Sequence, residues 1–517
     1  MNVSHAETAT AASAGVCGVA GSFAVAGRTP EFVVAPVAAL VVDFTPGVVT
    51  TAAIRGLGDW GHRLALGVAL ALTAGILAGV AFGAVRVGGR SEVPYTSVAA
   101  GGVASWLLTI AATGAPKASL AVAGPVAAVL AVGERGWAVG RDGRRSRVST
   151  SRRKVLAALG AVAGFAGFSA YRGADITGVE PGPVADVTSE AVQREADDML
   201  ARATERSLGV SGLSGLVTPT DEFYEVDVNN VNPNPSDGKW DLSVTGEVET
   251  SLTLDFEELT ATTVENRFVT LRCVGEALNG RKMDTAVWTG VPVRDLLDEA
   301  TPRGSGACCV LVRAVDGYYQ EFPLGALEES FLAVGMNGRR LPRGHGYPVR
   351  LLVPGHWGEI NVKWVSEIEV LDEEHQGYWE KRGWHGTGPV NTVAKLHAVN
   401  RPDDASDDTP GDSADESAES PTAERIEVAG HAYAGTRGIR KVEVSTDGGE
   451  TWADADLSKP LAGEDVWRQW RYAWDAEPGD HEVVVRATDG EGNLQPEEFA
   501  QPFPSGATGW VSRTVEV

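Results

Sequence analysis

A lone cysteine, Cys273, ends a strand-like run and precedes a polar, glycine-containing loop in the segment TLRCVGEALNG, residues 270–280. The other three cysteines of the chain are Cys17 and the adjacent pair Cys308 and Cys309, which lies in an apolar run. No CxxC motif occurs, which argues against a structural zinc site. Four cysteines in 517 residues do not form a disulfide framework. The pair is predicted to be buried in a strand, and the isolated thiol of Cys273 is a candidate for chemistry.

Strand segments bounded by glycine, proline and asparagine turns begin at residue 216 and surround this cysteine. A helical patch, VRDLLDEA at 293–300, lies between two of them. This mixture predicts an α+β domain over residues 216–400, preceded by a polar, partly helical connector over 174–215. The strand segments are 240–248, 267–273, 308–315, 347–354 and 362–371.

Residues 401–424 consist almost wholly of Asp, Glu, Ser, Ala and Pro. Such a segment cannot bury a core, so it is predicted to be a disordered acidic linker. Short alternating strands with turn signals such as DGG return over 425–517, which predicts a β-sandwich. Its tryptophans are expected to pack in the core and at strand edges: Trp452, Trp467, Trp470 and Trp474.

The first 173 residues carry repeated apolar runs rich in Ala, Gly and Val, a composition that suits close helix packing. A membrane span needs about 20 apolar residues, so four or five transmembrane helices are predicted. Asp43 and Pro46 interrupt the first run. The runs are 32–54, 64–85, 97–113, 118–133 and 155–170.

A basic cluster over residues 134–154 follows these runs. Positive loops stay in the cytoplasm, so the sequence predicts a multi-pass membrane protein whose later domains are extracellular. Arg152 and Arg153 precede an apolar stretch and resemble a twin-arginine export signal, although an ordinary basic flank is the alternative. His5 and His62 are the only histidines of the region. Intramembrane haem is therefore not expected, and the region is predicted to anchor the chain or to dock a partner.

The net charge of −25 is unevenly distributed along the chain. Residues 1–173 carry 15 Lys and Arg against 7 Asp and Glu, whereas the remaining residues carry 29 against 62. The acidic remainder argues against nucleic-acid binding, which needs a basic surface. Dense negative charge is tolerated where salt screens it, and the composition resembles that of proteins from salt-loving archaea.

From residue 216 onward the sequence resembles the sulfite oxidase family of molybdopterin enzymes. The resemblance implies a molybdopterin-binding domain over 216–400 and an immunoglobulin-like dimerisation domain over 425–517. Four motifs carry it in family order: FYEVDVNNVNPNP and WDLSVTGEV within 223–248, TLRCVGEALNG and VWTGVPVRDLL within 270–297, MNGRRLPRGHGYPVRLLVPGHWGEINVKWVSEIEV at 336–370, and VEVSTDGGETWADADL at 442–457.

The resemblance also implies a set of cofactor contacts. Molybdenum in this family is held by pterin dithiolene sulfurs and one protein thiolate, and Cys273 matches that soft ligand. Arg350 matches a residue that grips the cofactor phosphate with its planar guanidinium, and Lys363 and His345 match neighbouring contacts. Surface ion pairs are the alternative for Arg350 and Lys363. Further implied contacts are Asp221, Tyr224, Glu225, Asp316 and the backbone of Asn361 and Val362.

Two substrate-side features differ from those of animal and plant sulfite oxidases. The segment FYEVDVN, residues 223–229, lacks the arginine that helps to bind sulfite in those enzymes. Trp384, in YWEKRGW, stands where they have an active-site tyrosine. Trp384 is therefore a candidate catalytic residue, while sulfite is not implied as the substrate. Trp357 and His385 are candidates for the substrate funnel, although tryptophan is more often a core residue.

Charged residues of the cysteine loop are further candidates. Glu276 lies three residues after Cys273 and could relay a proton during oxygen-atom transfer, whereas a solvated loop carboxylate is the alternative. Arg281 and Lys282 could attract an anionic substrate, and an ordinary exposed basic pair is the alternative.

These features predict a membrane-anchored, molybdopterin-dependent oxidoreductase that transfers an oxygen atom and two electrons to or from a small oxo-anion, S-oxide or N-oxide. No cytochrome b5-like segment is present, so an external electron carrier is expected, and residues 425–517 are expected to form a homodimer. One alternative is a non-catalytic cell-surface binding or structural protein on a degenerate oxidase scaffold. Another is a transporter formed by residues 1–173, for which Asp43 is thin support.

Overall fold

The computed structural model describes residues 5–57, 59–141, 160–173, 181–228, 231–233, 239–401 and 424–517. Contacts divide the chain into two compact units, residues 1–180 with 227–234 and residues 181–226 with 235–517, and each unit is described by itself. The acidic linker predicted over 401–424 falls outside the described residues except at its two ends, and so do Arg152 and Arg153.

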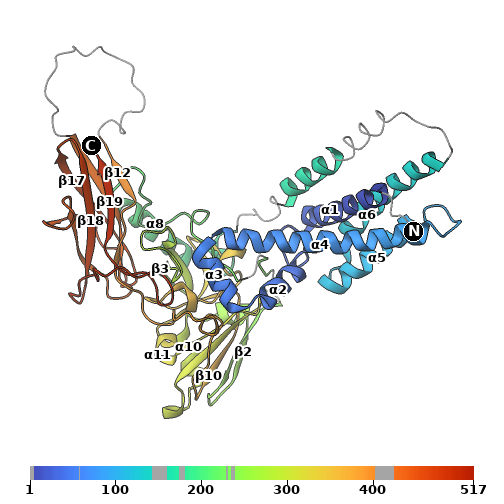
Figure 1. Ribbon diagram of the computed structural model, residues 1–517. Helices are drawn as coiled ribbons and strands as arrows, with labels where there is room; N and C mark the ends of the chain where they lie inside the picture. Colours follow the sequence, from blue (N-terminus) through green and yellow to red (C-terminus); the bar gives the residue numbers. More distant parts are fainter. Residues whose placement is uncertain are drawn as a thin grey trace. The chain divides into compact units, whose positions relative to one another are not determined.

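The first unit consists of apolar helices rich in alanine and glycine (Figure 1). A Cβ atom on Gly15 of α1 would lie 2.2 Å from the Ala74 carbonyl oxygen of α4, and one on Gly21 would lie 2.2 Å from the Ala121 carbonyl oxygen of α6. Such close backbone contact is typical of apolar helices that pack through small residues. The helices are α1 (His5–Ala26), α2 (Ala35–Phe44), α3 (Gly47–Leu57), α4 (Asp59–Gly88), α5 (Thr96–Thr113) and α6 (Pro116–Arg141), and residues 160–173 are also helical.

Four helices of this unit are long and apolar enough to cross a membrane, by length and composition: His5–Ala26, Arg63–Gly88, Thr96–Thr113 and Pro116–Glu134. The last three coincide with predicted apolar runs.

The other two predicted runs do not form a single helix of this kind within the described residues. The run 32–54 is a pair of short helices bent by 104°, because Pro46 disfavours helical backbone at the preceding Thr45, which is extended. The run 155–170 lies partly outside the described residues. Helix α1 was not among the predicted spans, because it is built mainly from Ala, Gly, Ser and Thr rather than from larger apolar side chains.

The second unit opens with the predicted connector, which contains η1 (Val184–Asp186) and α8 (Glu190–Arg206). The Ser189 hydroxyl caps α8 by accepting a hydrogen bond from the Val192 amide. A mixed α+β domain follows, whose first sheet has the order β2-β1-β10-β5-β6, with β1 and β10 parallel and its other pairs antiparallel. Its strands are β1 (Asp241–Gly246), β2 (Leu252–Asp255), β5 (Cys309–Ala314), β6 (Tyr319–Pro323) and β10 (Val365–Leu371).

The second sheet of this domain is antiparallel and has the order β3-β4-β7-β8, with β9 paired to β7. Apolar side chains of both sheets, such as Leu242, Ile368 and Trp288, are fully buried and form the core. The strands are β3 (Glu265–Arg272), β4 (Met283–Pro292), β7 (Phe331–Met336), β8 (Arg339–Arg340) and β9 (Arg350–Leu352). The intervening helices are α9 (Phe256–Thr260), α10 (Val293–Ala300), α11 (Leu324–Glu328), η3 (Gly304–Gly306), η4 (Arg343–His345), η5 (Gly358–Ile360) and η6 (Glu380–Arg382).

A β-sandwich completes the second unit (Figure 1). One sheet has the order β11-β13-β17-β16, with β12 paired to β13, and the other has the order β15-β14-β18-β19. The sandwich takes its first two strands from residues before 401. The strands are β11 (Val393–Ala394), β12 (Ala398–Asn400), β13 (Glu424–Tyr433), β14 (Ile439–Ser445), β15 (Ala453–Asp454), β16 (Asp456–Leu457), β17 (Arg468–Ala476), β18 (Asp480–Asp489) and β19 (Val511–Glu516).

The predicted α+β domain and β-sandwich are confirmed. Trp467 and Trp470 pack in the core as expected, and their indole N–H groups donate to the carbonyl oxygens of Leu216 and Lys395. The sandwich is therefore joined to the preceding domain by buried hydrogen bonds.

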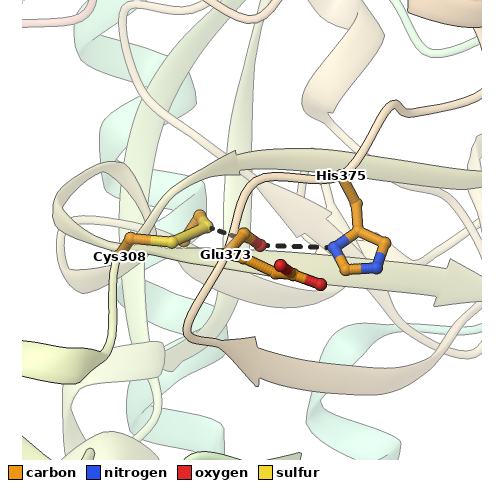
Figure 2. Close-up of a disulfide and its surroundings, with 4 residues drawn as sticks. Cys308, Glu373 and His375 are labelled. Atoms are coloured by element: carbon orange, nitrogen blue, oxygen red, sulfur yellow. Dashed lines mark hydrogen bonds between the residues drawn. A yellow bond between two sulfur atoms is a disulfide. The ribbon is translucent and has the colours of Figure 1, made fainter.

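The adjacent cysteines Cys308 and Cys309 form a disulfide at the start of β5 (Figure 2). Cys309 is buried, as predicted, whereas Cys308 is exposed because it precedes the strand. The Cys309 Sγ lies 3.4 Å from the Glu373 carbonyl oxygen, and His375 Nδ1 lies 3.2 Å from the same oxygen. The pair therefore contacts the loop that follows β10.

Candidate active site

Cys273 lies at the mouth of the loop that joins β3 to β4. Arg272 ends β3 opposite Met283, and the Cys273 amide donates to the Lys282 carbonyl oxygen at 3.0 Å. The thiol is free and half-buried. A Cβ atom on Gly275 would lie 3.9 Å from the Cys273 Sγ and 3.5 Å from the Trp384 ring. The structure therefore brings Cys273 and Trp384, 111 residues apart in sequence, to the same glycine.

A buried ion network holds this loop. The Glu276 carboxylate accepts hydrogen bonds from Arg272 Nε at 3.2 Å, from the Lys282 amide at 2.7 Å and from Lys395 Nζ. The side chains of Arg272, Glu276 and Lys395 are almost fully buried. The expected alternative of a solvated Glu276 is therefore wrong, because the carboxylate is buried and forms ion pairs with Arg272 and Lys395. Proton relay by Glu276 stays a prediction, and both of its oxygens are already engaged.

Arg272 and Lys395 were not among the predicted site residues. The Arg272 guanidinium stacks 4.8 Å from the centre of the Trp357 ring, and its Nη1 donates to the Asn391 carbonyl oxygen at 2.8 Å. Burial lowers the pKa of Lys395 to about 8, against the opposing effect of Glu276. Arg272 directly precedes Cys273 in sequence, but nothing local shows that this strand residue turns inward.

Tyr224 brings a hydroxyl group to the same region. Its amide donates to Asp284 Oδ2 at 3.0 Å, and its hydroxyl would lie 3.0 Å from a Cβ atom placed on Gly358. Burial first, and then the nearby Cys273, raise the pKa of Tyr224 well above its ordinary value. Tyr224 is therefore a neutral phenol that can donate a hydrogen bond.

His345, Arg350 and Lys363 gather around one tight turn. Gly346 has φ +109°, and a Cβ atom there would lie 2.9 Å from Arg350 Cβ and 3.2 Å from Lys363 Cβ. Carbonyl oxygens of the turn fix both cations, since Arg350 Nη1 donates to His345 at 3.2 Å and Lys363 Nζ donates to Gly344 at 2.8 Å. The turn requires glycine and creates a compact cationic cradle.

The His345 ring shows the electrostatic character of this cradle. His345 is buried, and burial first, followed by Arg350 and Lys363, lowers its pKa to about 3. Its Nε2 lies 3.4 Å from the Thr220 carbonyl oxygen and 3.8 Å from Glu225 Oε1. The ring is thus neutral at pH 7 beside two fixed cations, and the cradle favours an anion.

Asn361 and Val362 act as supports of the cradle. The Asn361 carbonyl oxygen accepts from Arg350 Nη2 at 3.2 Å, and its side-chain amide bonds to the backbone of Val353 and Trp357. Val362 is buried, and its carbonyl oxygen accepts from the Leu351 amide. Both residues therefore orient Arg350 and β9.

Asp316 and Asp221 lie at the margins of the site. Asp316 accepts a hydrogen bond from the Tyr318 amide in the turn between β5 and β6. The Val315 amide donates to the Trp364 carbonyl oxygen, which places this turn one residue from Lys363. Asp221 is exposed and follows Thr220, whose carbonyl oxygen contacts His345.

The remaining predicted residues are less central. Trp357 is buried beneath Arg272, which matches the expected core alternative. Arg281 is exposed and lines a cavity of about 150 Å³ with Asp284. Lys282 is half-buried, and its backbone is part of the cysteine loop. His385 is exposed, and its amide donates to the Pro504 carbonyl oxygen.

Comparisons with known proteins identify the family of this chain. The model of the oxidoreductase molybdopterin binding domain matches residues 228–379, and the model of the Mo-co oxidoreductase dimerisation domain matches residues 410–503. Chicken sulfite oxidase is 30% identical over 332 residues, which cover 55% of this chain and 69% of that protein. The chain belongs to the sulfite oxidase family of molybdopterin-dependent oxidoreductases.

Two other relatives show the range of this family. Mouse mitochondrial sulfite oxidase is 29% identical over 348 residues, and spinach nitrate reductase [NADH] is 28% identical over 348 residues. Each match covers 55% of this chain, but 58% of the mouse protein and 36% of the spinach protein. The chain thus spans only part of the length of these relatives.

The chain is therefore an enzyme that uses a molybdenum cofactor. The side chains present fit that group. Cys273 offers a sulfur ligand to a soft metal, while Arg350, Lys363 and neutral His345 form a cradle that fits an anionic phosphate tail. Position 346 must be glycine, because a side chain there would crowd the Cβ atoms of Arg350 and Lys363.

Proposed function

We propose that this enzyme transfers an oxygen atom, with two electrons, to or from a small uncharged or weakly charged S- or N-oxide. The proposal depends mainly on the proximity of Cys273 to Trp384, since both side chains lie within 4 Å of a Cβ atom placed on Gly275. The cationic turn of Arg350 and Lys363 belongs to the same unit. A ligating thiol and a phosphate cradle are the two protein parts that a molybdopterin site requires.

Each residue of the site has a role that follows from its surroundings. When bound, the cofactor supplies the two-electron redox chemistry and the oxygen-atom transfer. Cys273 would ligate the metal, while Arg350, Lys363 and His345 would hold the anionic tail of the pterin. Tyr224 keeps its proton and can therefore donate a hydrogen bond within the site. The buried network of Glu276 keeps the cysteine loop in place.

The wall beside Cys273 favours an uncharged substrate. Trp384 is buried, and its ring packs edge-to-face on Phe503 at 5.2 Å and on Trp379 at 6.3 Å. Contact with an aromatic wall does little to stabilise a bound dianion such as sulfite, because a charged group loses hydration there. A sulfoxide or N-oxide with an apolar substituent gains contact area there.

Metal analysis and a substrate panel test this proposal. The purified full-length protein should contain stoichiometric molybdenum and pterin, and Cys273→Ala should reduce molybdenum to background. Cys17→Ala, which alters the other free cysteine, is the matched control and should retain the metal. Activity with an artificial electron carrier should be higher on sulfoxides and N-oxides than on sulfite or nitrate. Wild-type molybdenum content in Cys273→Ala would contradict the assignment.

The surroundings of the enzyme are a second part of the proposal. We infer that the chain is a multi-pass membrane protein whose second unit lies outside the cell, that it exchanges electrons with an external carrier, and that it dimerises through its β-sandwich. Four sufficiently long apolar helices support the membrane anchor, and the match to the dimerisation domain model supports the dimer.

A further inference from the structure

Two glutamates meet around one buried amide at the edge of the site. Gln320 of β6 is fully buried, and its Nε2 donates to Glu359 Oε1 at 3.2 Å and to Glu380 Oε2 at 2.5 Å. Glu359 belongs to η5 and is 8% exposed, whereas Glu380 belongs to η6 and is half-buried. Burying two charged carboxylates beside one neutral amide is energetically unfavourable unless one of them is neutralised.

Two glycines make room for this carboxyl pair. A Cβ atom on Gly386 would lie 2.1 Å from Glu359 Oε2, and one on Gly377 would lie 2.4 Å from Glu380 Oε2. Any side chain at either position would therefore collide with a carboxyl group. The absence of side chains at positions 377 and 386, on either side of Trp384 in the sequence, therefore leaves space for the two carboxyl groups.

One oxygen of each carboxyl group lacks a hydrogen-bond partner within the described part of the chain, and a proton shared by the pair would supply one. Among the described residues, Glu359 Oε2 and Glu380 Oε1 are buried and have no hydrogen-bond partner. Burial and then the adjacent Glu380 raise the pKa of Glu359 to about 9. Two carboxylates in contact cannot both be charged in such surroundings, and one proton between them removes a charge and completes the bonding.

The pair lies between the Cys273 loop and a group of carboxylates nearer to solvent. On the inner side, a Cβ atom on Gly386 would also lie 3.3 Å from Val274 Cγ1, next to Cys273, and the Tyr318 hydroxyl donates to the Glu359 carbonyl oxygen at 2.7 Å. On the outer side, Glu321 has its pKa raised to about 7 by burial and then by Glu374 and Glu380. The titratable groups facing the pair are Cys273 and Tyr318 on the inner side, and Glu321, Glu374 and His375 on the outer side.

We propose that Glu359 and Glu380 share one proton and form the station through which protons pass between the Cys273 site and solvent. This inference rests on the proposed function. Oxidation of a substrate converts substrate and water to oxygenated substrate, two protons and two electrons, and reduction is the reverse. The electrons go to the external carrier, while each proton enters the pair at Glu359 and leaves from Glu380, which is closer to solvent.

Infrared spectroscopy of the full-length protein in detergent tests the shared proton without any turnover. The wild type at pH 8, where buried carboxyl groups with a pKa of about 7 such as Glu321 are mostly ionised, should show a C=O band of a protonated carboxyl group that shifts in D₂O. Glu359→Gln and Glu380→Gln should each lose this band. Glu367→Gln is the matched control, because Glu367 is a half-buried glutamate that pairs with Arg313 on the first sheet. Absence of the band in the wild type, or its persistence in both variants, would overturn the proposal.

Kinetics tests the path itself. At equal molybdenum content, Glu359→Gln should lower kcat roughly 10-fold or more, a loss within the range of general acid–base catalysis. It should also change the pH profile of kcat and increase the solvent deuterium isotope effect, which a purely structural role would not do. Glu367→Gln should behave as wild type. An unchanged pH profile in Glu359→Gln would overturn the path, whereas loaded wild-type protein inactive on every substrate would overturn the proposed function and leave the infrared test intact.

Discussion

At the scale of single residues, the site depends on burial that keeps histidines neutral and cations fixed. His345, His397 and His431 all have a lowered pKa, to about 3, 4 and 3, with burial as the main cause. The buried side chains of Lys395 and Glu276 form an ion pair beside the cysteine loop. The neutral state of these three histidines is therefore set by their burial rather than by small changes of pH near neutrality.

Removal of Lys395 should destabilise the fold, because it leaves the buried ion network incomplete. Lys395→Met leaves the Glu276 carboxylate with Arg272 alone, and breaking a buried ion pair costs about 3–5 kcal/mol. Thermal unfolding at pH 7 should show a clear fall in Tm. Arg294→Ala breaks the exposed pair with Glu329 and should cost at most about 1 kcal/mol. Equal Tm losses in the two variants would contradict a network based on burial.

Acid stability should depend on His431. This ring stacks on Trp467 at 3.8 Å between ring centres, and its folded pKa of about 3 lies below the usual histidine pKa of 6.5. Between these values the unfolded chain binds more protons, so the contribution is present above pH 6.5 and is lost as pH falls toward 3. His431→Phe should therefore reduce the slope of stability against pH in this window by up to about 1.4 kcal/mol per pH unit. Unfolding followed by fluorescence from pH 7 to pH 4 measures this slope, and an unchanged slope would contradict the assignment.

At the scale of elements, short turns rather than long helices or strands position the chemistry. The cysteine loop joins β3 to β4, and the cationic turn precedes β9. Each is anchored by a paired strand, which gives a loop residue a fixed place. The 3₁₀ helices η5 and η6 add Glu359 and Glu380 in the same way.

The turn at Gly346 should be intolerant of a side chain. Gly346→Ala would place Cβ 2.9 Å from Arg350 Cβ in addition to the strain of φ +109°. Molybdenum per chain after purification should fall markedly, because the cradle opens. Gly317→Ala is a matched control, since Gly317 also has positive φ (+88°) but has no atom within 4 Å of the added Cβ. Equal losses of metal in both variants would show that backbone strain, not crowding of the cradle, is responsible.

At the scale of the whole molecule, two units of opposite composition share one chain. The first is built of apolar helices with glycine contacts, and the second of sheets with a strongly acidic sequence. The residues of the candidate active site all lie in the second unit. This separation is the basis for assigning anchoring to one unit and chemistry to the other.

Removal of the first unit should change solubility but not cofactor loading. A chain of residues 181–517 should be found in the soluble fraction without detergent and should bind molybdenum, whereas the full chain should be extracted only with detergent. Cell fractionation with metal analysis measures both outcomes. Release of the full chain by salt alone would contradict a membrane anchor.

The sequence by itself indicated the cofactor, and it predicted the metal ligand and the residues of the cradle. Cys273, His345, Arg350 and Lys363 lie in short motifs whose spacing is independent of distant contacts. The alternating strand pattern likewise predicted the sandwich, because strand periodicity is a local property.

Only the tertiary structure decided the burial of Glu276 and the partnership of Glu359 with Glu380. Lys395 reaches Glu276 across 119 residues, and Glu380 meets Gln320 across 60 residues. No local pattern encodes such pairs, because a charged side chain in a loop has the same sequence signature whether it faces solvent or a buried partner. The packing of β3, β11 and the 3₁₀ helices around the site makes that choice.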